Sequence, residues 1–449
     1  MSTSRITTPM PGPPPHETLS GWGRVPVPAR ERRSEDLRAL TRGMPISRGL
    51  GRSYGDSSLP PPSRPLAANT TLGDRILAFD AATGVARTEA GLSLVDLHRV
   101  LLPRGFFTPV SPGTQFVTMG GCVAADVHGK NHHVAGCFGA HVSELTLAVA
   151  DGRVVTCSPT VERDLFRATV GGMGLTGHIL EVEFRMQGVP SAWIDQEIER
   201  VPNIDAFVEG LDRAAREWPF TMGWIDCLKP GASMGRGLVI KGRWSPDGPR
   251  ELPRAPVRPS VPFVLPEFVL SPLSIRAFNE IIYRFTPTGR SRVGYHTFWY
   301  PLDAIGHWNR MYGRRGFTQY QCVIPRAAGR EAVREFLQLM VQRGGATFLC
   351  VIKDCGEEGT GLLSFPKPGT SIALDLAIRP NTQAIVDALN ARLIEMGGRV
   401  YLAKDTLTRA EDFRRMEPRL PEWLEIRRKW DPHLVFRSAQ SVRLLGDPP

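Results

Sequence analysis

Residues 48–56 read Arg-Gly-Leu-Gly-Arg-Ser-Tyr-Gly-Asp, so three glycines and two arginines stand within nine positions. Glycine adopts positive φ angles at little cost and lets a ligand approach the backbone closely. Successive N–H groups in such a turn bind anions, and the guanidinium groups of Arg48 and Arg52 add charge-assisted hydrogen bonds. The stretch therefore predicts a phosphate-binding loop, with a glycine-rich surface turn as the alternative.

A second glycine-rich stretch covers residues 111–133 and includes Thr-Met-Gly-Gly at 118–121. Its many small residues suit a backbone that is pressed against a flat ligand. Three histidines follow, but Gly129 disfavours the helix on which two of them would form a metal-binding pair. We expect His132 and His133 to be hydrogen-bonded side chains at the surface, and we expect no metal site.

A third glycine-rich stretch, residues 169–177 (Thr-Val-Gly-Gly-Met-Gly-Leu-Thr-Gly), leads into residues 178–184, where apolar and polar side chains alternate as in a half-buried strand. It resembles a dinucleotide fingerprint only loosely, because the Rossmann motif follows a strand and opens a helix. The pattern argues against a nicotinamide-binding Rossmann domain.

The C-terminal half contains an internal near-repeat. Each copy has a predicted strand, a proline, a helix, a Gly-Gly pair and a second strand that ends in Lys-Asp, over residues 316–354 and 370–405. A Gly pair after each helix is typical of a helix C-terminal cap. Two β-α-β units in tandem predict one sheet with helices on a single face, which leaves the other face to line a pocket. Gln319 and Gln321 are two positions apart on one strand, so they share a face.

Three other segments complete the organisation. Residues 192–218 read as a strand followed by an amphipathic helix, because apolar residues recur there at helical spacing. Prolines recur every few residues between Pro249 and Pro272, which excludes a regular element and predicts a long loop with an apolar tip. The proline-rich residues 1–18 are expected to form a disordered leader.

Length and composition exclude several classes of protein. The chain has 449 residues, of which 42% are hydrophobic and 22% charged, which is a globular balance. Its net charge of +10 suits an anionic partner, but the basic side chains are dispersed without aromatic interleaving, which argues against nucleic acid. The sequence has neither an apolar run of about 18 residues nor an apolar signal segment. Its seven scattered cysteines predict free thiols in a reducing compartment.

Taken in order, the motifs resemble the PCMH-type FAD-binding domain of the vanillyl-alcohol oxidase superfamily and, within it, the oxidases of lipid-linked ribose. The motifs that carry the resemblance are RGLGRSYGD (48–56), DVHGKNHH (126–133), TVGGMGLTG (169–177), WNRMYGRRGFTQYQ (308–321), LLSFPKPG (362–369) and GGRVYLAKD (397–405). The implied fold is α+β, with a two-part FAD-binding domain and a substrate domain that has an antiparallel sheet with helices on one face. The implied boundaries are a leader (1–18), the FAD-binding domain (19–190), the substrate-binding domain (191–395) with a mobile loop near 248–275, and a C-terminal segment (396–449) that returns to the flavin.

The resemblance also implies which residues hold the flavin. The loop would bind the pyrophosphate, the Gly-Gly stretch would follow the ribityl chain and ring, Ile179 would lie near the adenine, and Tyr401 would reach the flavin. The implied cofactor-binding residues are Ser47, Arg48, Gly49, Leu50, Gly51, Arg52, Ser53, Tyr54, Gly55, Asp56, Ser57, Gly113, Thr118, Met119, Gly120, Gly121, His128, Ile179 and Tyr401. Many superfamily members attach FAD covalently through a histidine where this chain has Arg52. Because a guanidinium group is not a usable nucleophile, we expect FAD to bind non-covalently.

For the reaction, the resemblance places Lys404 and His128 beside the flavin and the reacting sugar. Lys404 could act as a base if burial lowered its pKa from about 10.4, or as an ammonium group it could stabilise the reduced flavin and orient the hydroxyl. The implied substrate-binding residues are Lys130, Trp224, Trp299, Gln319, Gln321, Lys353 and Ala373. The chain departs from the pattern of its actinobacterial relatives at Ala373, where they have cysteine, at Trp299, where a tyrosine is expected, and at Ser371, where an asparagine is expected.

The expected reaction is oxidation of the 2′-hydroxyl of a polyprenylphosphoryl-β-D-ribofuranose to the 2′-keto sugar. It would be the first half of an epimerisation that makes an arabinose donor for cell-wall polysaccharide. The alternative enzyme is a soluble alditol or aldonolactone oxidase. The resemblance also implies a separate NAD(P)H-dependent short-chain reductase as partner. It implies peripheral membrane contact through the apolar loop, and we therefore expect a cytoplasmic or peripheral membrane location. We expect no nucleic-acid binding.

Overall fold

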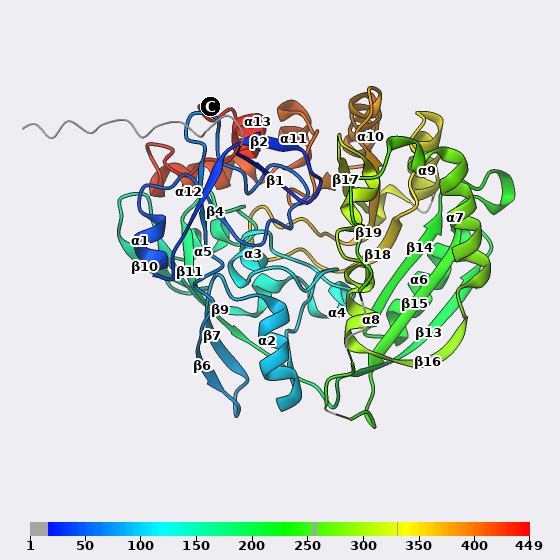
Figure 1. Ribbon diagram of the computed structural model, residues 1–449, viewed down its shortest axis with the longest axis horizontal. Helices are drawn as coiled ribbons and strands as arrows, with labels where there is room; N and C mark the ends of the chain where they lie inside the picture. The colour runs from blue at the N-terminus through cyan, green and yellow to red at the C-terminus, as the bar shows by residue number, and fades with distance from the viewer. Residues whose placement is uncertain (1–16, 250, 255–257, 330) are drawn as a thin grey trace, which may run out of the picture.

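The computed structural model describes residues 17–249, 251–254, 258–329 and 331–449 (Figure 1). Residues 1–16 of the predicted leader, and residues 250 and 255–257 of the predicted loop, lie outside this range. The fold combines helices with mainly antiparallel sheets, which confirms the predicted α+β class.

The N-terminal part contains a small parallel sheet and a five-stranded antiparallel sheet in the order β10-β9-β11-β7-β6. Its strands are β1 (Thr18–Ser20), β2 (Pro26–Pro28), β3 (Arg30–Arg33), β4 (Ser47–Arg48), β5 (Leu66–Asn69), β6 (Ile76–Asp80), β7 (Val85–Glu89), β8 (Phe106–Phe107), β9 (Val142–Ala148), β10 (Val154–Cys157), β11 (His178–Arg185) and β12 (Gln187–Gly188). Its helices are α1 (Leu37–Thr41), α2 (Leu94–Leu101), α3 (Met119–Ala124), α4 (His132–Ala135) and α5 (Arg163–Thr169). The third glycine-rich stretch leads into β11, as the alternating pattern predicts.

The second part is built on one antiparallel sheet of eight strands in the order β16-β13-β15-β14-β18-β19-β17-β20 (Figure 1). The strands are β13 (Trp193–Val201), β14 (Phe220–Asp226), β15 (Arg236–Trp244), β16 (Gly289–Gly294), β17 (Phe317–Pro325), β18 (Cys350–Cys355), β19 (Gly369–Ala377) and β20 (Arg399–Val400). The helices of this part are α6 (Ile204–Glu217), α7 (Pro272–Phe285), α8 (Tyr295–Trp299), α9 (Glu331–Gln342) and α10 (Thr382–Glu395).

The sheet is a duplication. In the second half, β17-α9-β18 and β19-α10-β20 form two interlocked β-α-β units, as the near-repeat predicts. The first half repeats the same plan with β13-α6-β14 and β15-α7-β16. The two halves meet where β14 pairs with β18, at Gly223 opposite Ile352.

Helices α6, α7, α9 and α10 share one face of the sheet. Their apolar side chains, such as Phe207 and Phe336, pack with Ile225 and Ile352 of the strands in a single buried cluster. Gly344 and Gly397 end α9 and α10 with φ angles of +83° and +70°, as expected for C-terminal caps. The face without helices is therefore free to border a cleft.

Three predicted boundaries differ from the structure. The leader predicted to be disordered over residues 1–18 overlaps β1, which begins at Thr18. Helix α7 begins at Pro272, inside the segment predicted to be loop, because proline is tolerated in the first turn, where its missing N–H is not needed. The last strand of the repeat ends at Val400 rather than at Lys404. The N–H of Tyr401 donates to Gln321 O, and the chain turns directly after Tyr401. The turn is held by a hydrogen bond of 2.9 Å from Tyr54 N–H to Ala403 O.

Helices α11 (Ala410–Met416), α12 (Leu420–Trp430) and α13 (Ala439–Leu445) cover the N-terminal part. Trp423 Nε1 donates to Ala168 O at 2.9 Å, and Arg443 forms an ion pair with Asp56 at 2.7 Å. The seven cysteines are buried free thiols. Among the residues that the structure describes, no helix has the length and apolar character needed to cross a bilayer.

Candidate functional site

A deep cleft lies between the helix-free face of the large sheet and the glycine-rich loops of the N-terminal part. Its empty space, including the mouth that is open to solvent, is about 1720 Å³. The large sheet contributes Gln319, Gln321, Val351, Lys353 and Ala373 to its lining. The alternation of side chains along β17, β18 and β19 places these residues on one face.

The first glycine-rich stretch forms one wall of the cleft. In the part of the chain that the structure describes, none of the amides of residues 50–53 donates a hydrogen bond to a protein acceptor. Gly51 has a φ of +64°, which only glycine adopts easily. Such a run of free N–H groups is suited to a phosphate group.

Four of the residues predicted to bind the cofactor lie outside the lining of the cleft. Arg48 points away from it, because its guanidinium binds Glu31 at 2.6 Å and Ser20 O at 2.8 Å. Asp56 is held by Arg443, and Gly55 packs against the carbonyl of Asp405. The fourth is Met119, whose side chain is buried in the core of the N-terminal part.

The second glycine-rich stretch continues the wall. Thr118 caps α3 by accepting from Gly121 N at 3.3 Å, and Gly120 packs against Ala90. A Cβ on Gly113 would meet nothing within 4 Å, so the backbone there borders open space. The predicted cofactor-binding residues that line the cleft are Ser47, Gly49, Leu50, Gly51, Arg52, Ser53, Tyr54, Ser57, Gly113, Thr118, Gly120, Gly121, His128, Ile179 and Tyr401.

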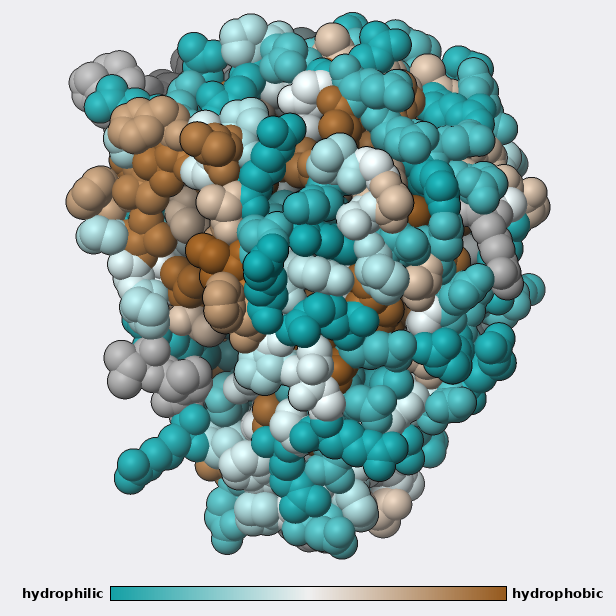
Figure 2. All heavy atoms as spheres, turned by 90° about the vertical axis from the view of Figure 1, so that its right-hand side faces the viewer, coloured by the Kyte–Doolittle hydropathy of each residue, from teal (hydrophilic) through white to brown (hydrophobic). Residues whose placement is uncertain are grey.

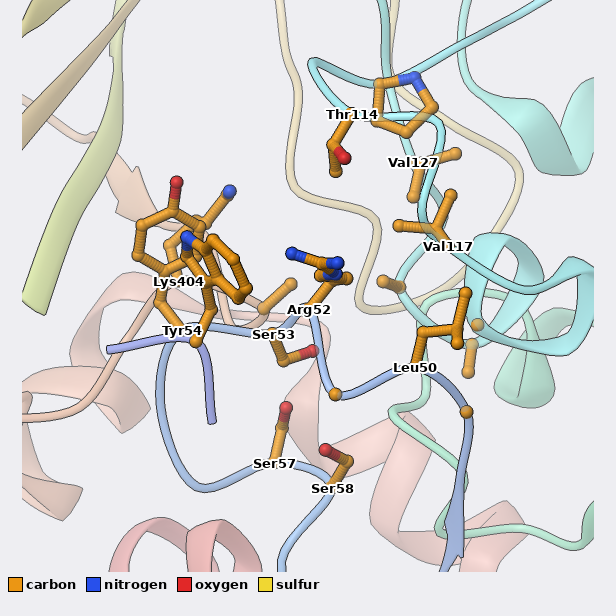
Figure 3. A pocket seen from close by; sticks show the side chains of 18 of the residues that line it. Leu50, Arg52, Ser53, Tyr54, Ser57, Ser58, Thr114, Val117, Val127 and Lys404 are labelled. Carbon is orange, nitrogen blue, oxygen red and sulfur yellow. The ribbon is translucent and has the colours of Figure 1, made fainter. Parts of the chain in front are cut away.

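Arg52 projects into the middle of the cleft (Figure 3). Its guanidinium lies 4.0 Å from the ring centre of Trp22 and 5.1 Å from that of Phe116. Burial lowers its pKa, and the nearby Asp303 carboxylate opposes that shift. Asp303, which the sequence does not single out, accepts from Thr114 Oγ1 at 2.7 Å.

The cleft contains polar groups without a protein partner that could bind FAD. The buried atoms Arg52 Nε, Ser57 Oγ and His128 Nδ1 have no hydrogen-bond partner in the described chain. Buried polar atoms are nearly always paired, so these three indicate a polar ligand. Together with the free amides of residues 50–53, they would serve a long ligand that carries a pyrophosphate at one end.

Lys404 also lines the cleft, beside Tyr54 (Figure 3). Its Nζ is 3.8 Å from the ring centre of Tyr54. Burial lowers the pKa of Lys404 to about 7; the Asp375 carboxylate opposes this shift and the Lys353 ammonium adds to it. At neutral pH, Lys404 is therefore a free amine in a large fraction of the molecules.

Asp375 is a buried carboxylate that the sequence analysis missed. It accepts a hydrogen bond from Tyr312 Oη at 2.9 Å and one from Gln319 Nε2 at 2.5 Å. Burial raises its pKa to about 6, and both hydrogen bonds and the Lys404 ammonium oppose that rise. Its place two residues after Ala373 on β19 was the available signal, because positions two apart share a face.

His128 is held in one orientation by Gln321. The Gln321 amide donates to His128 Nε2 at 2.9 Å and to Ser371 Oγ at 3.2 Å. Burial, with added repulsion from Lys353, lowers the pKa of His128 well below its ordinary value. The ring is thus neutral and carries its proton on Nδ1.

Three predicted substrate-binding residues do not line the cleft. Trp299 is only 1% exposed within an aromatic cluster that includes Phe107 and Phe298. Lys130 donates to Trp299 O at 2.7 Å, and burial lowers its pKa to about 7. Trp224 lies beyond the lining, with its Nε1 bound to Phe348 O at 2.9 Å.

His132 is buried rather than at the surface, which corrects the expectation from sequence. Its Nε2 lies 3.4 Å from Cys137 Sγ, and its Nδ1 accepts from Gly356 N at 3.0 Å. These contacts tie α4 to the end of β18. His133 is half-buried, with Nε2 bound to Trp218 O at 3.0 Å.

Comparisons with known proteins agree with this site. Residues 40–158 match the family model described as "FAD binding domain". The chain is 37% identical to the decaprenylphosphoryl-beta-D-ribose oxidase of Mycolicibacterium smegmatis over 95% of this chain and 97% of that protein. It is 33% identical to an uncharacterised Streptomyces coelicolor protein over 78% of this chain and 100% of that protein. The L-gulonolactone oxidase of Mus musculus is 34% identical, over 26% of each chain.

The similarity to the Mycolicibacterium smegmatis oxidase covers 95% of this chain, so it takes in both the FAD-binding part and the large sheet. The chain therefore belongs to the FAD-dependent oxidoreductase family of the decaprenylphosphoryl-β-D-ribose oxidases.

Proposed function

We propose that the protein oxidises the 2′-hydroxyl of a polyprenylphosphoryl-β-D-ribofuranose to the 2′-keto sugar. The observation that carries this proposal is the 37% identity to an oxidase of decaprenylphosphoryl ribose over nearly the whole length of both chains. The cleft supports it, because Lys404 and His128 lie together in the same cavity as the loop of free amides. The product would feed the formation of an arabinose donor for cell-wall polysaccharide.

Bound FAD would accept the hydride from the sugar carbon. The free amine of Lys404 takes the hydroxyl proton, because a base with a pKa near the working pH is the most effective. His128 donates its Nδ1–H to the sugar, while Gln321 fixes the ring. Lys353 supplies positive charge for the phosphate of the substrate.

A free-sugar oxidase is the weaker candidate. The L-gulonolactone oxidase of Mus musculus matches only about a quarter of this chain. The lining also contains the Lys353 ammonium, and a buried positive charge suits an anionic substrate better than a neutral alditol or lactone. A phosphorylated sugar therefore fits the cleft better.

The proposed reaction also needs a partner and a location. An NAD(P)H-dependent short-chain reductase would reduce the 2′-ketone to complete the epimerisation, since one oxidation alone does not invert a carbon. The substrate carries a polyprenyl chain, so the protein would act at a membrane surface, as a cytoplasmic or peripheral membrane protein. Nucleic acid has no part in this proposal.

Acid precipitation of the purified yellow protein is expected to release all of its flavin into the supernatant. Arg52 occupies the position of the linking histidine, and its guanidinium is held against Trp22. His128 is the one imidazole among the described lining residues, and its Nε2 is occupied by Gln321. The absorbance of the supernatant and of the redissolved pellet near the flavin bands measures how much flavin is released and how much stays bound to the protein. Colour that stays in the pellet would contradict non-covalent binding.

Anaerobic mixing with substrate tests the function itself. We expect polyprenylphosphoryl-β-D-ribofuranose to bleach the flavin absorbance, and free ribose, an alditol and an aldonolactone to leave it unchanged over the same time. Bleaching by a free sugar alone would favour the soluble sugar oxidase. A protein that cannot be loaded with FAD would end both proposals.

A further inference from the structure

Exposed apolar side chains are concentrated in one segment of the chain. Six of the large hydrophobic side chains that are exposed in the described residues fall between positions 263 and 285, and they include every exposed phenylalanine. We call this set the α7 patch. Its members are Phe263, Phe268, Leu273, Phe278, Ile281 and Phe285.

Helix α7 is amphipathic with its apolar side outward. Its inner side packs on the sheet through Ile275 and through Asn279, which donates to Asp226 at 2.9 Å. Leu273, Ile281 and Phe285 lie on the outer side at steps of four or eight residues, with exposures of 78%, 55% and 75%. Figure 2 looks onto the side of the molecule that carries α7, and it shows apolar side chains gathered in one area beside a largely hydrophilic surface.

The backbone of residues 261–267, before α7, is held in place by arginine side chains. Arg310 donates to Val261 O and Pro262 O, each at 2.8 Å, and Arg379 donates to Glu267 O at 2.9 Å. The backbone is thus fixed while the side chains of Phe263 and Phe268 stay 63% and 77% exposed. An ordered apolar surface of this kind usually marks a binding surface.

A chain of aromatic contacts links the α7 patch to the lining of the cleft. Phe278 packs against Phe348 with ring centres 5.4 Å apart, and Phe348 packs against Tyr312 at 5.7 Å. Tyr312 ends the short helix η6 (Trp308–Tyr312), whose Trp308 lines the cleft, and Leu349 after Phe348 also lines it. Apolar side chains therefore lead from the catalytic cleft to the outer side of α7.

Positive charge borders the patch on two sides. Arg276 lies exposed on α7 itself. Arg314 is exposed next to Gly313, which packs against Glu267 of the short helix η4 (Glu267–Leu270). No ion pair holds Arg276 or Arg314 within the described ranges, and the chain as a whole carries a net charge of +10. Such a border complements anionic headgroups rather than a second copy of the same basic chain.

We propose that the α7 patch docks the protein on a bilayer that contains anionic lipids, with the exposed aromatic side chains inserted below the headgroups. The proposal rests on the proposed function, because it explains how a cleft for a sugar phosphate receives a substrate whose polyprenyl chain stays in the bilayer. Apolar area and attraction to anionic headgroups add in such interfacial binding. The outer side of α7 would lie along the membrane, and the cleft mouth would open toward it.

Vesicle flotation of the FAD-loaded protein tests the docking surface without any substrate. We expect the protein to bind vesicles of equal phosphatidylglycerol and phosphatidylcholine, and to bind pure phosphatidylcholine vesicles more weakly. The double variant Phe268→Glu with Phe285→Glu should lose at least about tenfold in binding, because two exposed aromatic anchors become anions. Both side chains are more than 70% exposed, so folding should be unaffected.

Val161→Glu is the matched control, because Val161 is 54% exposed at a distant site and should bind like the unchanged protein. Equal binding by the double variant, or no binding by the unchanged protein, would overturn the proposal. So would a dimer in solution that the double variant turns into a monomer, since a second copy would then cover the patch. Flavin reduction by a short-chain, water-soluble polyprenylphosphoryl ribose should be unchanged in the double variant, which separates failure of docking from failure of the proposed function.

Discussion

Replacing Lys404 with methionine should slow flavin reduction by the substrate by about 10²–10⁴-fold, which is the usual contribution of a general base. The methionine is close in length to lysine but cannot take the hydroxyl proton. The protein should still be yellow, because the loop that would bind the pyrophosphate lies at residues 50–53, on the wall formed by the N-terminal part. Stopped-flow absorbance under anaerobic conditions measures the rate.

Two further variants make this test specific. Lys353→Met removes the ammonium group that would face the substrate phosphate, and it should weaken substrate binding much more than it slows reduction at saturation. Lys404→Arg keeps the charge but remains protonated, so it should stay slow if the lysine acts as a base. Reduction by Lys404→Met within tenfold of the unchanged protein would show that Lys404 does not carry the proton.

The helix-free face of the large sheet could be anticipated because strands alternate with a strict period of two. That rule places Gln319 with Gln321, and it likewise places Asp375 with Ala373. The glycine-rich loops were equally predictable, since positive φ at Gly51 demands glycine.

Side-chain directions that depend on distant partners could not be anticipated. Arg48 belongs to the phosphate-loop motif, yet Glu31 lies 17 residues earlier and draws its guanidinium out of the cleft. Trp299 is buried because Phe107 and Phe298 come together around it in the fold. Lys404 reaches the cleft through a turn that is fixed by Tyr54, more than 300 residues away in sequence.

The two lysines of the cleft come from similar positions of the near-repeat in sequence, although Lys353 lies on β18 and Lys404 lies in the turn after β20. Lys353 follows the first Gly-Gly pair and Lys404 follows the second, and both line the same cavity. The equivalent duplication in β13–β16 escaped detection because its second helix follows a proline-rich segment and lacks a Gly-Gly cap. Repeated topology thus survives where the sequence signature of the repeat does not.

Replacing Asp375 with asparagine should move the pH dependence of flavin reduction toward acid. In the unchanged protein the rate should rise with pH and level off above about pH 7, as Lys404 loses its proton. The Asp375 carboxylate stabilises the Lys404 ammonium, so its removal lowers the pKa of Lys404 further. An opposite charge at short range shifts a pKa by about one to three units. The pH at which the rate of flavin reduction rises should therefore be lower in the variant by at least about one unit.

The slope of the pH profile separates the two possible roles of Lys404, because the profile moves to lower pH in Asp375→Asn in both cases. If the ammonium form were the active one, activity would fall as the pH rises through 7, and Asp375→Asn would bring that fall to lower pH. If the amine is active, as we propose, the variant keeps more of its maximal rate at pH 6 than the unchanged protein does. Asp375→Glu retains the charge and should keep the rise in rate near pH 7. A merely structural effect of Asp375→Asn would lower the rate at every pH without changing the pH at which the rate rises. If that pH stays near 7 in the variant, Asp375 does not set the protonation of Lys404.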